Sequence, residues 1–338
     1  MTNARKNLLY SLVLASLIGI VWLWRTFQSP KMITLQGNTM GSTYQIKYID
    51  VQNRNFQSDI DSILAAFTRS LSTWEPESEI SRFNKGDSLV YESPFFYPVL
   101  QKSLEVYIKT DGAFNPAVKP LVNAWGFGEN KKDSVNQHII DSLLTFSDFR
   151  LVRFDEKKIV KLDKRVMLDF NAIAPGYACD VIGEFLRKQG IERFMIEISG
   201  EILCKGLNLE NQPWKIGIED PRVTEDKRKV FRTVALQEQA LATSGNYRNF
   251  YIKNGKKYAH TINPKTGMPA QHNLLSASVI APDCMSADAY ATACMVLGLH
   301  NAKQLLEQNP DLEGMLIYDE EGTLKVYTTQ GFERLLLP

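Results

Sequence analysis

Residues 275–297 read LSASVIAPDCMSADAYATACMVL. The apolar start of this stretch predicts a strand over residues 275–280, and the longer segment after it predicts a helix over residues 286–297. Strands predominate through the whole carboxyl half, but they do not alternate regularly with helices. We therefore expect an α+β fold, with mixed or antiparallel sheets flanked by helices, rather than a doubly wound parallel sheet.

The helix in this stretch carries a pair of oxygen-bearing side chains. Asp288 and Thr292 stand four residues apart, so a helix places them on one face, one turn from each other. A carboxylate and a hydroxyl in this arrangement suit a hard cation such as Mg²⁺, which binds few protein oxygens and keeps positions for phosphate and water. The alternative is an Asp that only stabilises the positive end of the helix dipole.

Further elements are predicted on the amino-terminal side of this stretch. Apolar alternation or short apolar runs predict strands over residues 32–49, 166–170, 194–198 and 214–218. Apolar residues at helical spacing predict helices over residues 55–71, 98–110, 116–125 and 177–189.

The composition is that of a globular protein with no polyelectrolyte partner. The 338 residues are 44% hydrophobic and 23% charged, and the net charge is +1. This length is enough for one large core or two closely joined domains. A nucleic-acid-binding protein would normally carry a basic excess, so we expect no nucleic-acid partner.

The first 31 residues differ from the rest. Arg5 and Lys6 precede an apolar run over residues 8–24, and no acidic residue comes before Asp50. As a helix the run would rise about 25 Å, just enough to cross a bilayer core. We expect an uncleaved, single-pass anchor in the inner membrane, with the domain of residues 32–338 on the periplasmic side. A cleaved signal peptide is the alternative.

Cysteine and histidine usage narrows the chemistry. The four cysteines form no C-x-x-C pair, and their apolar surroundings predict buried free thiols; oxidation outside the cytoplasm is the alternative. The sequence holds four histidines, so a His-rich zinc site is not expected. It also lacks a G-x-G-x-x-G motif, a Walker A loop and a G-x-S-x-G elbow, so nucleotide binding here must use a less common architecture.

Two segments could contact phosphates. Residues 242–247 (ATSGNY) form a polar sequence that could present backbone amides to an anion, although a tight turn between two strands is the simpler interpretation. Residues 168–177 join a strand to a helix that begins near Pro175, and helix amino termini attract phosphates. Many such junctions bind nothing.

Single side chains leave similar alternatives. His260 could be a general base or a hydrogen-bonded histidine at the end of a strand. Trp74, Trp125 and Phe127 lie in or beside predicted loops, where aromatic rings can hold a flat ligand or cover a core.

Taken together and in this order, these segments resemble the ApbE family, the FAD:protein FMN transferases, from about residue 32 to the carboxyl end. The matching blocks are residues 40–44 (MGSTY), 78–84 (SEISRFN), 112–115 (GAFN), 120–128 (PLVNAWGFG), 176–180 (GYACD), 242–245 (ATSG), 260–262 (HTI), and Ala287 and Asp288 with Thr292.

The resemblance implies an ApbE-like α+β flavin transferase fold and an Mg²⁺-dependent reaction. Such an enzyme splits the FAD diphosphate, attaches FMN through a phosphoester to a Thr or Ser of a partner protein, and releases AMP. The usual partner is a flavin-carrier subunit of a membrane redox complex.

The resemblance also implies roles for particular residues. It places the metal on Asp288, Thr292 and the backbone carbonyl of Ala172, and it makes Asp288 and His260 catalytic, with His260 as a base or phosphate contact. The FAD contacts that it implies are Met40, Trp74, Ala113, Phe114, Asn115, Asp169, Pro175, Ile262 and Ala291.

This chain departs from the family pattern at a few positions. Asn115 and Asn263 stand where many members have Asp, and Asn171, Ala172 and Pro175 stand where many have paired glycines and a Lys. These changes affect single FAD contacts and leave the metal pair intact.

Two rival functions stay open. The first is an FAD pyrophosphatase, which would use the same site with water as acceptor. The second is a non-catalytic flavin-binding module. The pair of Asp288 and Thr292 argues against the second, because flavin storage needs no cation.

Overall fold

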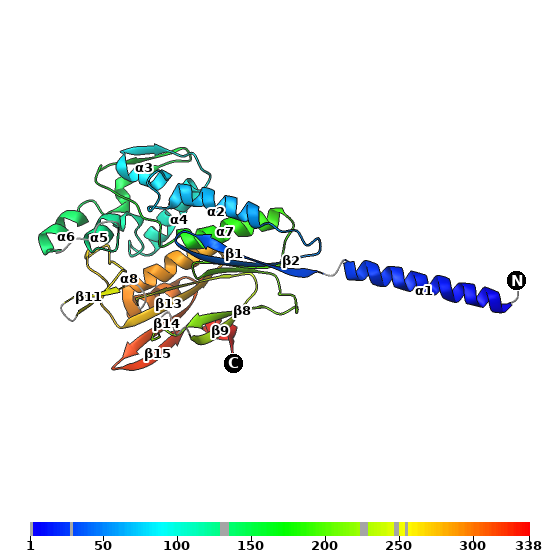
Figure 1. The fold of residues 1–338 in the computed structure, drawn as a ribbon. Coiled ribbons are helices and arrows are strands. Elements are labelled where there is room, and N and C mark those ends of the chain that lie inside the picture. Colours follow the sequence, from blue (N-terminus) through cyan, green and yellow to red (C-terminus); the bar gives the residue numbers. More distant parts are fainter. Residues whose placement is uncertain (1–2, 28–29, 129–134, 224–228, 247–249, 254–255) are drawn as a thin grey trace.

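The computed structural model describes the chain except for residues 1–2, 28–29, 129–134, 224–228, 247–249 and 254–255 (Figure 1). Within the described part, eight strands form one antiparallel sheet. Its strands, in spatial order, are β1 (Lys31–Thr39), β2 (Ser42–Asp50), β6 (Phe194–Ile198), β7 (Glu201–Lys205), β10 (Ala240–Gly245), β13 (Leu274–Ala281), β14 (Glu313–Glu320) and β15 (Thr323–Thr328).

Smaller antiparallel sheets accompany the main one. They are β3 (Ser88–Val90), β5 (Lys158–Lys161) and β4 (Val152–Phe154); β16 (Leu336–Leu337), β9 (Val230–Leu236) and β8 (Trp214–Glu219); and β11 (Phe250–Lys253) with β12 (Lys256–Ala259).

Helices cover the sheets and extend the chain at its amino end. The α-helices are α1 (Asn3–Phe27), α2 (Gln57–Leu71), α3 (Glu79–Lys85), α4 (Phe96–Lys109), α5 (Lys119–Ala124), α6 (Gln137–Leu144), α7 (Ala174–Lys188), α8 (Cys284–Gln308) and α9 (Gln330–Leu335), and the 3₁₀ helices are η1 (Pro116–Val118) and η2 (Phe149–Leu151). The expected α+β class with antiparallel sheets and flanking helices is therefore confirmed.

The main sheet lies between two layers. Helices α7 and α8 run along one face, and β8 and β9 lie on the other (Figure 1). Successive residues of a strand alternate between these layers: Val279 packs in the core under the helices, and Ile280 in the core under the small sheet. Both faces of β13 are thus buried, which explains why its sequence is an unbroken apolar and small-residue run.

The stretch 275–297 folds as the sequence predicts, with one addition. The helix begins at Cys284, where the Asp283 carboxylate accepts a hydrogen bond from the Ser286 amide at 2.7 Å. Gly298 then interrupts it with φ 73° and ψ 172°, and helix continues to Gln308. The predicted end at residue 297 is therefore a break that only a residue tolerant of positive φ permits.

The strand predicted over residues 166–170 is wrong. The Asn84 side chain occupies the groups that a neighbouring strand would use: its Oδ1 accepts from the Leu168 amide at 2.7 Å, and its Nδ2 donates to the Leu168 carbonyl at 2.8 Å. The Val166 amide donates to the Asp163 carbonyl at 3.1 Å, which closes a turn. A side chain distant in sequence has replaced the strand partner.

Of two further predictions, the amino-terminal transmembrane helix is not found and the buried free thiols are confirmed. Residues 3–27 are helical, but across the described residues no helix is long and apolar enough to cross a membrane, so the predicted transmembrane helix is not found. The predicted buried free thiols are confirmed for Cys179, Cys204, Cys284 and Cys294.

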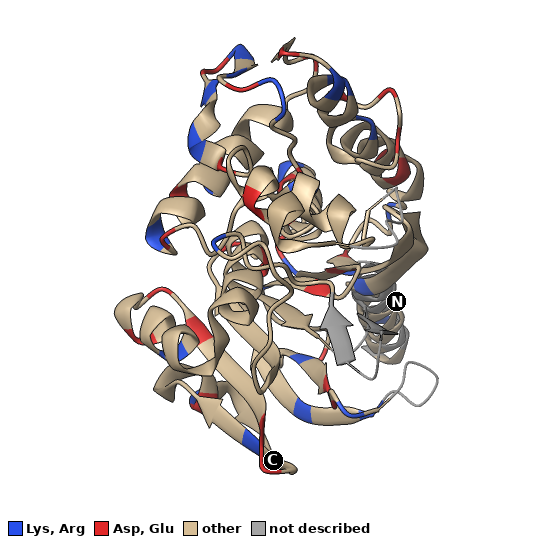
Figure 2. Ribbon diagram, turned by 90° about the vertical axis from the view of Figure 1, so that its left-hand side faces the viewer, with Lys and Arg blue, Asp and Glu red and all other residues tan. Residues whose placement is uncertain are grey.

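Charged residues are mixed in sign over the face drawn in Figure 2. Positions of Lys and Arg and positions of Asp and Glu both occur in the upper and in the lower part of the fold in this view.

Helices α7 and α8 approach each other closely at Gly176. A Cβ atom added to Gly176 would lie 2.3 Å from the Cys284 carbonyl oxygen and 2.8 Å from the Asp288 Cβ. Both contacts are with parts of α8 that cannot rotate away, so the helices can cross here only because residue 176 has no side chain.

We predict that Gly176→Ala destabilises the protein by about 1–3 kcal/mol, because the added methyl group forces α7 and α8 apart. Urea unfolding followed by circular dichroism measures the change in free energy of unfolding.

Gly183→Ala, in the same helix, is the matched control. Its added Cβ would lie 2.7 Å from Leu203 Cδ2, the end of a flexible side chain, and alanine has the better helix propensity. Equal stability of the two variants would contradict the tight crossing at Gly176.

Candidate functional site

Asp288 is a buried carboxylate at the α7–α8 crossing. The residue is 4% exposed, and its Oδ2 accepts a hydrogen bond of 3.1 Å from the Gly176 amide in the first turn of α7. Burial raises the pKa of Asp288 to about 7, against the lowering effect of this hydrogen bond. Within the described residues Oδ1 accepts no hydrogen bond. A carboxylate so placed is stabilised by a cation.

Thr292 lies one turn further along α8 and is half-buried. Its Oγ1 is 3.1 Å from the Ser244 Oγ of β10. The turn considered for residues 242–247 is therefore wrong as far as residue 245: Thr243, Ser244 and Gly245 pair with β13, and Thr243 Oγ1 lies 2.8 Å from Ser278 Oγ. This hydroxyl contact between neighbouring strands satisfies the polar side chains, so that polar residues can continue the strand. Tyr247 lies outside the described residues.

The first turn of α7 comes close to Asp288 at Gly176. Ala172 stands two residues before the helix begins, Pro175 lies in its first turn, and both are half-buried. The donors that the family resemblance implies are one carboxylate, one hydroxyl and one backbone carbonyl, and such an all-oxygen set fits Mg²⁺. No cluster of three or more His, Cys, Asp and Glu that could hold a metal ion occurs among the described residues.

The predicted contacts around residue 115 lie in a buried turn. Asn115 Oδ1 accepts from the Ala117 amide and its Nδ2 donates to the Ser147 carbonyl, both at 2.9 Å. The Asp169 amide donates to the Pro116 carbonyl at 2.8 Å, so the loop before α7 lies beside this turn. Ala113 and Phe114 are buried with it. The Asn115 side chain is thus already used to hold the turn.

A second pairing joins residues 125–128 to the segment after β12. The Trp125 indole donates to the Gly267 carbonyl at 2.7 Å. The rings of Phe127 and His260 meet edge to face with centroids 6.4 Å apart. Ile262 is buried and forms an isolated bridge with Pro269. Aromatic residues that the sequence placed near loops therefore hold the His260 segment in position.

The remaining predicted FAD contacts are spread over the fold. Met40 has φ 49° in the turn between β1 and β2, and Trp74 is 63% exposed after α2. Ala291 is fully buried in α8. The structure thus brings Asp288 to the first turn of α7, which contains Pro175, and Thr292 follows one turn further along α8. Among the described residues no hydrogen bond joins Met40 or Trp74 to this crossing.

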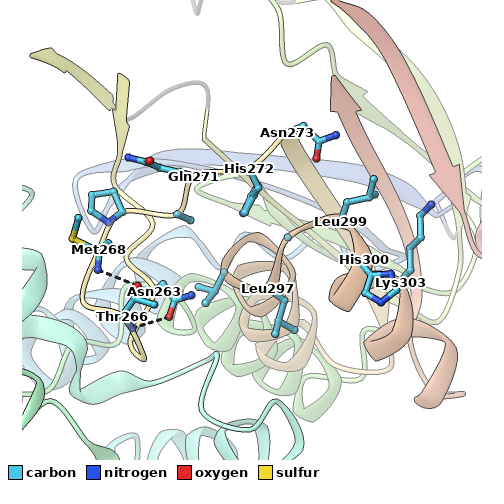
Figure 3. Close-up of a pocket in the computed structure, with 14 residues that line it drawn as sticks. Asn263, Thr266, Met268, Gln271, His272, Asn273, Leu297, Leu299, His300 and Lys303 are labelled. Atoms are coloured by element: carbon cyan, nitrogen blue, oxygen red, sulfur yellow. Dashed lines mark hydrogen bonds between the residues drawn. The ribbon is translucent and has the colours of Figure 1, made fainter. Parts of the chain in front are cut away.

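A cavity of about 800 Å³ lies further along α8 (Figure 3). It lies between the segment that contains Asn263, Met268 and His272 and the part of α8 that starts at Val296, four residues after Thr292. His272 points towards α8, and its Nε2 lies 2.7 Å from the Met295 carbonyl oxygen. The volume is in the range of small-molecule sites, about 300–1,000 Å³.

Two partners of the site were missed from the sequence. The Gly176 amide contacts Asp288, and the Ser244 hydroxyl contacts Thr292. A glycine in the first turn of a helix signals close approach of a neighbour, but nothing local in the sequence names that neighbour.

Known proteins resemble this chain over most of its length. The model of the ApbE family matches residues 40–316. A FAD:protein FMN transferase of Vibrio cholerae is 33% identical over 334 residues, which cover 96% of this chain and 98% of the relative. That of Escherichia coli K12 is 31% identical, with 91% and 90% covered.

Solved structures agree as well. The flavin transferase ApbE from Vibrio cholerae superposes with a TM-score of 0.81 at 32% identity, covering 90% of this chain and 99% of that one. The apo form of the Pseudomonas stutzeri flavinyl transferase ApbE gives a TM-score of 0.81 at 29% identity, with 90% and 97% covered. This chain therefore belongs to the ApbE family and has the α+β fold of its flavin transferases.

Proposed function

We propose that this protein is an Mg²⁺-dependent FAD:protein FMN transferase, which attaches FMN to a Thr or Ser of a partner flavoprotein and releases AMP. The observation that carries the proposal is the buried Asp288 carboxylate. One of its oxygens accepts a hydrogen bond from the Gly176 amide, and Thr292 lies one turn further along the same helix. The transferase names of the relatives over most of their length support it.

Asp288, Thr292 and the carbonyl of Ala172 would hold the cation. Among the described residues no basic side chain pairs with the buried Asp288, which fits this assignment because a buried carboxylate is normally paired or metal-bound. When bound, Mg²⁺ would offset the charge of the diphosphate and of the departing AMP. Ser244 would orient the Thr292 hydroxyl.

In the proposed reaction the acceptor hydroxyl oxygen attacks the phosphorus on the FMN side of the diphosphate. The bond from that phosphorus to the bridging oxygen breaks, and AMP leaves with the oxygen. The hydroxyl proton passes to a base, for which we propose His260, held against Phe127. Alignment and charge stabilisation dominate phosphoryl transfer, so few reacting side chains are needed.

An FAD pyrophosphatase would use the same residues with water as the acceptor. A non-catalytic flavin-binding module would leave FAD intact. Incubation with FAD, Mg²⁺ and a flavin-carrier subunit, followed by mass spectrometry of the carrier and of the small molecules, separates the three functions. A transferase increases the mass of the carrier by one FMN unit, a pyrophosphatase releases free FMN and AMP, and a binding module leaves FAD unchanged.

We further propose a flavin-carrier subunit of a membrane redox complex as the acceptor and the extracytoplasmic side of the membrane as the location. The location rests on the basic and then apolar pattern of the first 31 residues. Protection of the catalytic domain from protease added to spheroplasts would contradict it.

We predict that Asp288→Asn lowers FMN transfer at least a hundredfold while the fold is kept. Asparagine can still accept from the Gly176 amide, but it removes the charge that a cation needs. Thr292→Ala should cost less, because water can replace a neutral hydroxyl. The measurement is the rate of covalent flavin appearance on the carrier protein.

Thermal melting serves as the fold control for both variants. Transfer by Asp288→Asn at the wild-type rate would refute the metal assignment. A loss of activity matched by a loss of melting temperature would instead favour a carboxylate that only supports the helix.

We predict that His260→Ala slows transfer at least tenfold and leaves FAD affinity within about threefold, because a general base typically contributes 10²–10⁴-fold and does not hold the ground state. Single-turnover rates and FAD titration separate the two effects. Weakened FAD binding with an unchanged rate would make His260 a phosphate contact.

We predict that the stabilisation by Mg²⁺ grows as pH rises from 6 to 8. The pKa of Asp288 in the folded protein is about 7, above about 3.9 in the unfolded chain. Its contribution to the stability of the metal-free protein is therefore full below pH 4 and is lost as pH rises through 7. Mg²⁺ competes with the proton, so it restores most at high pH.

The difference in melting temperature with Mg²⁺ and with EDTA measures this effect. Burial also raises the pKa of Asp180 to about 7, so this carboxyl group titrates in the same range. The quantity to compare at each pH is therefore the increase in melting temperature caused by Mg²⁺, not the melting temperature itself. An increment in Asp288→Asn equal to that of the wild type would exclude Asp288 as the ligand.

A further inference from the structure

Helices α7 and α8 each begin against a carboxylate of the other. The Gly176 amide in the first turn of α7 donates to Asp288 of α8 at 3.1 Å. In return, the first two amides of α8, those of Cys284 and Met285, donate to Oδ1 and Oδ2 of Asp180 in α7 at 2.9 and 2.8 Å. We call these five residues the α7–α8 clasp.

The two acids at the start of α8 have different tasks. Asp283, on the same chain segment, caps the helix by accepting from the Ser286 amide at 2.7 Å. This local bond holds whichever way α8 is turned. Asp180 belongs to another helix and takes two adjacent amides with its two oxygens, which fixes both the shift and the rotation of α8 relative to α7.

The geometry links Asp180 to Asp288 directly. Cys284 precedes Asp288 by four residues, one helical turn on the same face. The carbonyl oxygen of Cys284 also lies where a Cβ of Gly176 would be, at 2.3 Å. The amide of Cys284 is thus held by Asp180, its carbonyl is packed against Gly176, and Asp288 follows in the next turn.

We propose that Asp180 is a positioning residue for Asp288. Its hydrogen bonds to the first turn of α8 hold the Asp288 carboxylate at the amino end of α7, next to the Gly176 amide. This inference rests on the proposed function for its link to Mg²⁺. The positioning itself does not depend on a metal, because it consists of the hydrogen bonds from the Cys284 and Met285 amides to Asp180.

Replacement of Asp180 by Asn tests this positioning. Asparagine keeps one accepting oxygen and presents an NH₂ group to the other amide, so one of the two bonds is replaced by a contact between donors. Asp283→Ala is the matched control, because it removes the cap of the same helix and leaves both amide bonds to Asp180 in place.

The chain offers a selective probe of the result. Pro175–Gly176 is the only Pro–Gly pair in the sequence. Labelling with ¹³C-carbonyl proline and ¹⁵N-glycine therefore isolates one amide resonance, that of Gly176. Its chemical shift and its hydrogen-exchange rate report on the bond to Asp288, with or without metal. A titration with Mg²⁺ alone, by calorimetry, gives the dissociation constant.

For Asp180→Asn we expect exchange at Gly176 at least tenfold faster and a dissociation constant for Mg²⁺ raised about tenfold, because the groups that orient metal ligands typically contribute 10–100-fold in affinity. For Asp283→Ala we expect a lower melting temperature, with both other quantities within twofold of the wild type. Asp180→Glu, which keeps the carboxylate, should recover part of both losses.

A Gly176 amide in Asp180→Asn that exchanges as in the wild type overturns the proposal, and so does an equal effect of Asp283→Ala, which would indicate general fraying of α8. Should Asp180→Asn not fold, Asp180→Glu is read by the same criteria. A wild-type protein that binds no Mg²⁺ would refute the metal assignment of the proposed function, while the exchange comparison would still decide whether Asp180 positions Asp288.

Discussion

The crossing of α7 and α8 at Gly176 is the constraint on which the site depends. Asp288 lies in a helix whose neighbouring residues are small and buried, and the residue is itself 4% exposed. A donor within the protein therefore stabilises its charge. That donor is the first-turn amide of another helix, and it comes within 3.1 Å only because residue 176 has no side chain. The main sheet, against which both helices pack, lies beneath this contact.

The same contact leaves the carboxylate incompletely satisfied. One amide bond offsets only part of the cost of burial, so the pKa of Asp288 stays raised to about 7. A site built for stability alone would place a basic side chain or an apolar residue here. The proposed metal assignment would explain why a carboxylate with one amide partner among the described residues is kept at this crossing.

Local sequence patterns predicted the helices and strands that pack in the ordinary way, with no distant side chain bonded to their backbone. The helices near residues 57–71 and 174–188 and the strand at residues 194–198 follow from apolar spacing. The failures occur where a distant side chain intervenes. Asn84 takes the backbone groups of Leu168, and paired hydroxyls allow the polar residues 243–245 to continue a strand. Neither effect has a local signature, because each depends on residues more than 30 positions away.

The residues of the candidate site also fall into those that the sequence predicted and those that only the packing of the fold brings together. Spacing alone brought Asp288 and Thr292 to one helical face, because both belong to one regular element. Their partners Gly176 and Ser244 are 112 and 48 positions distant, and only the packing of α8 against α7 and β10 brings them close. The roles of Ala172 and His260 came from family resemblance rather than from any pattern. Chemistry that proceeds mainly by alignment and charge uses backbone groups and helix ends, which any residue type can supply. The sequence therefore marks a charged side chain such as Asp288 far better than it marks the backbone groups that hold this side chain in place.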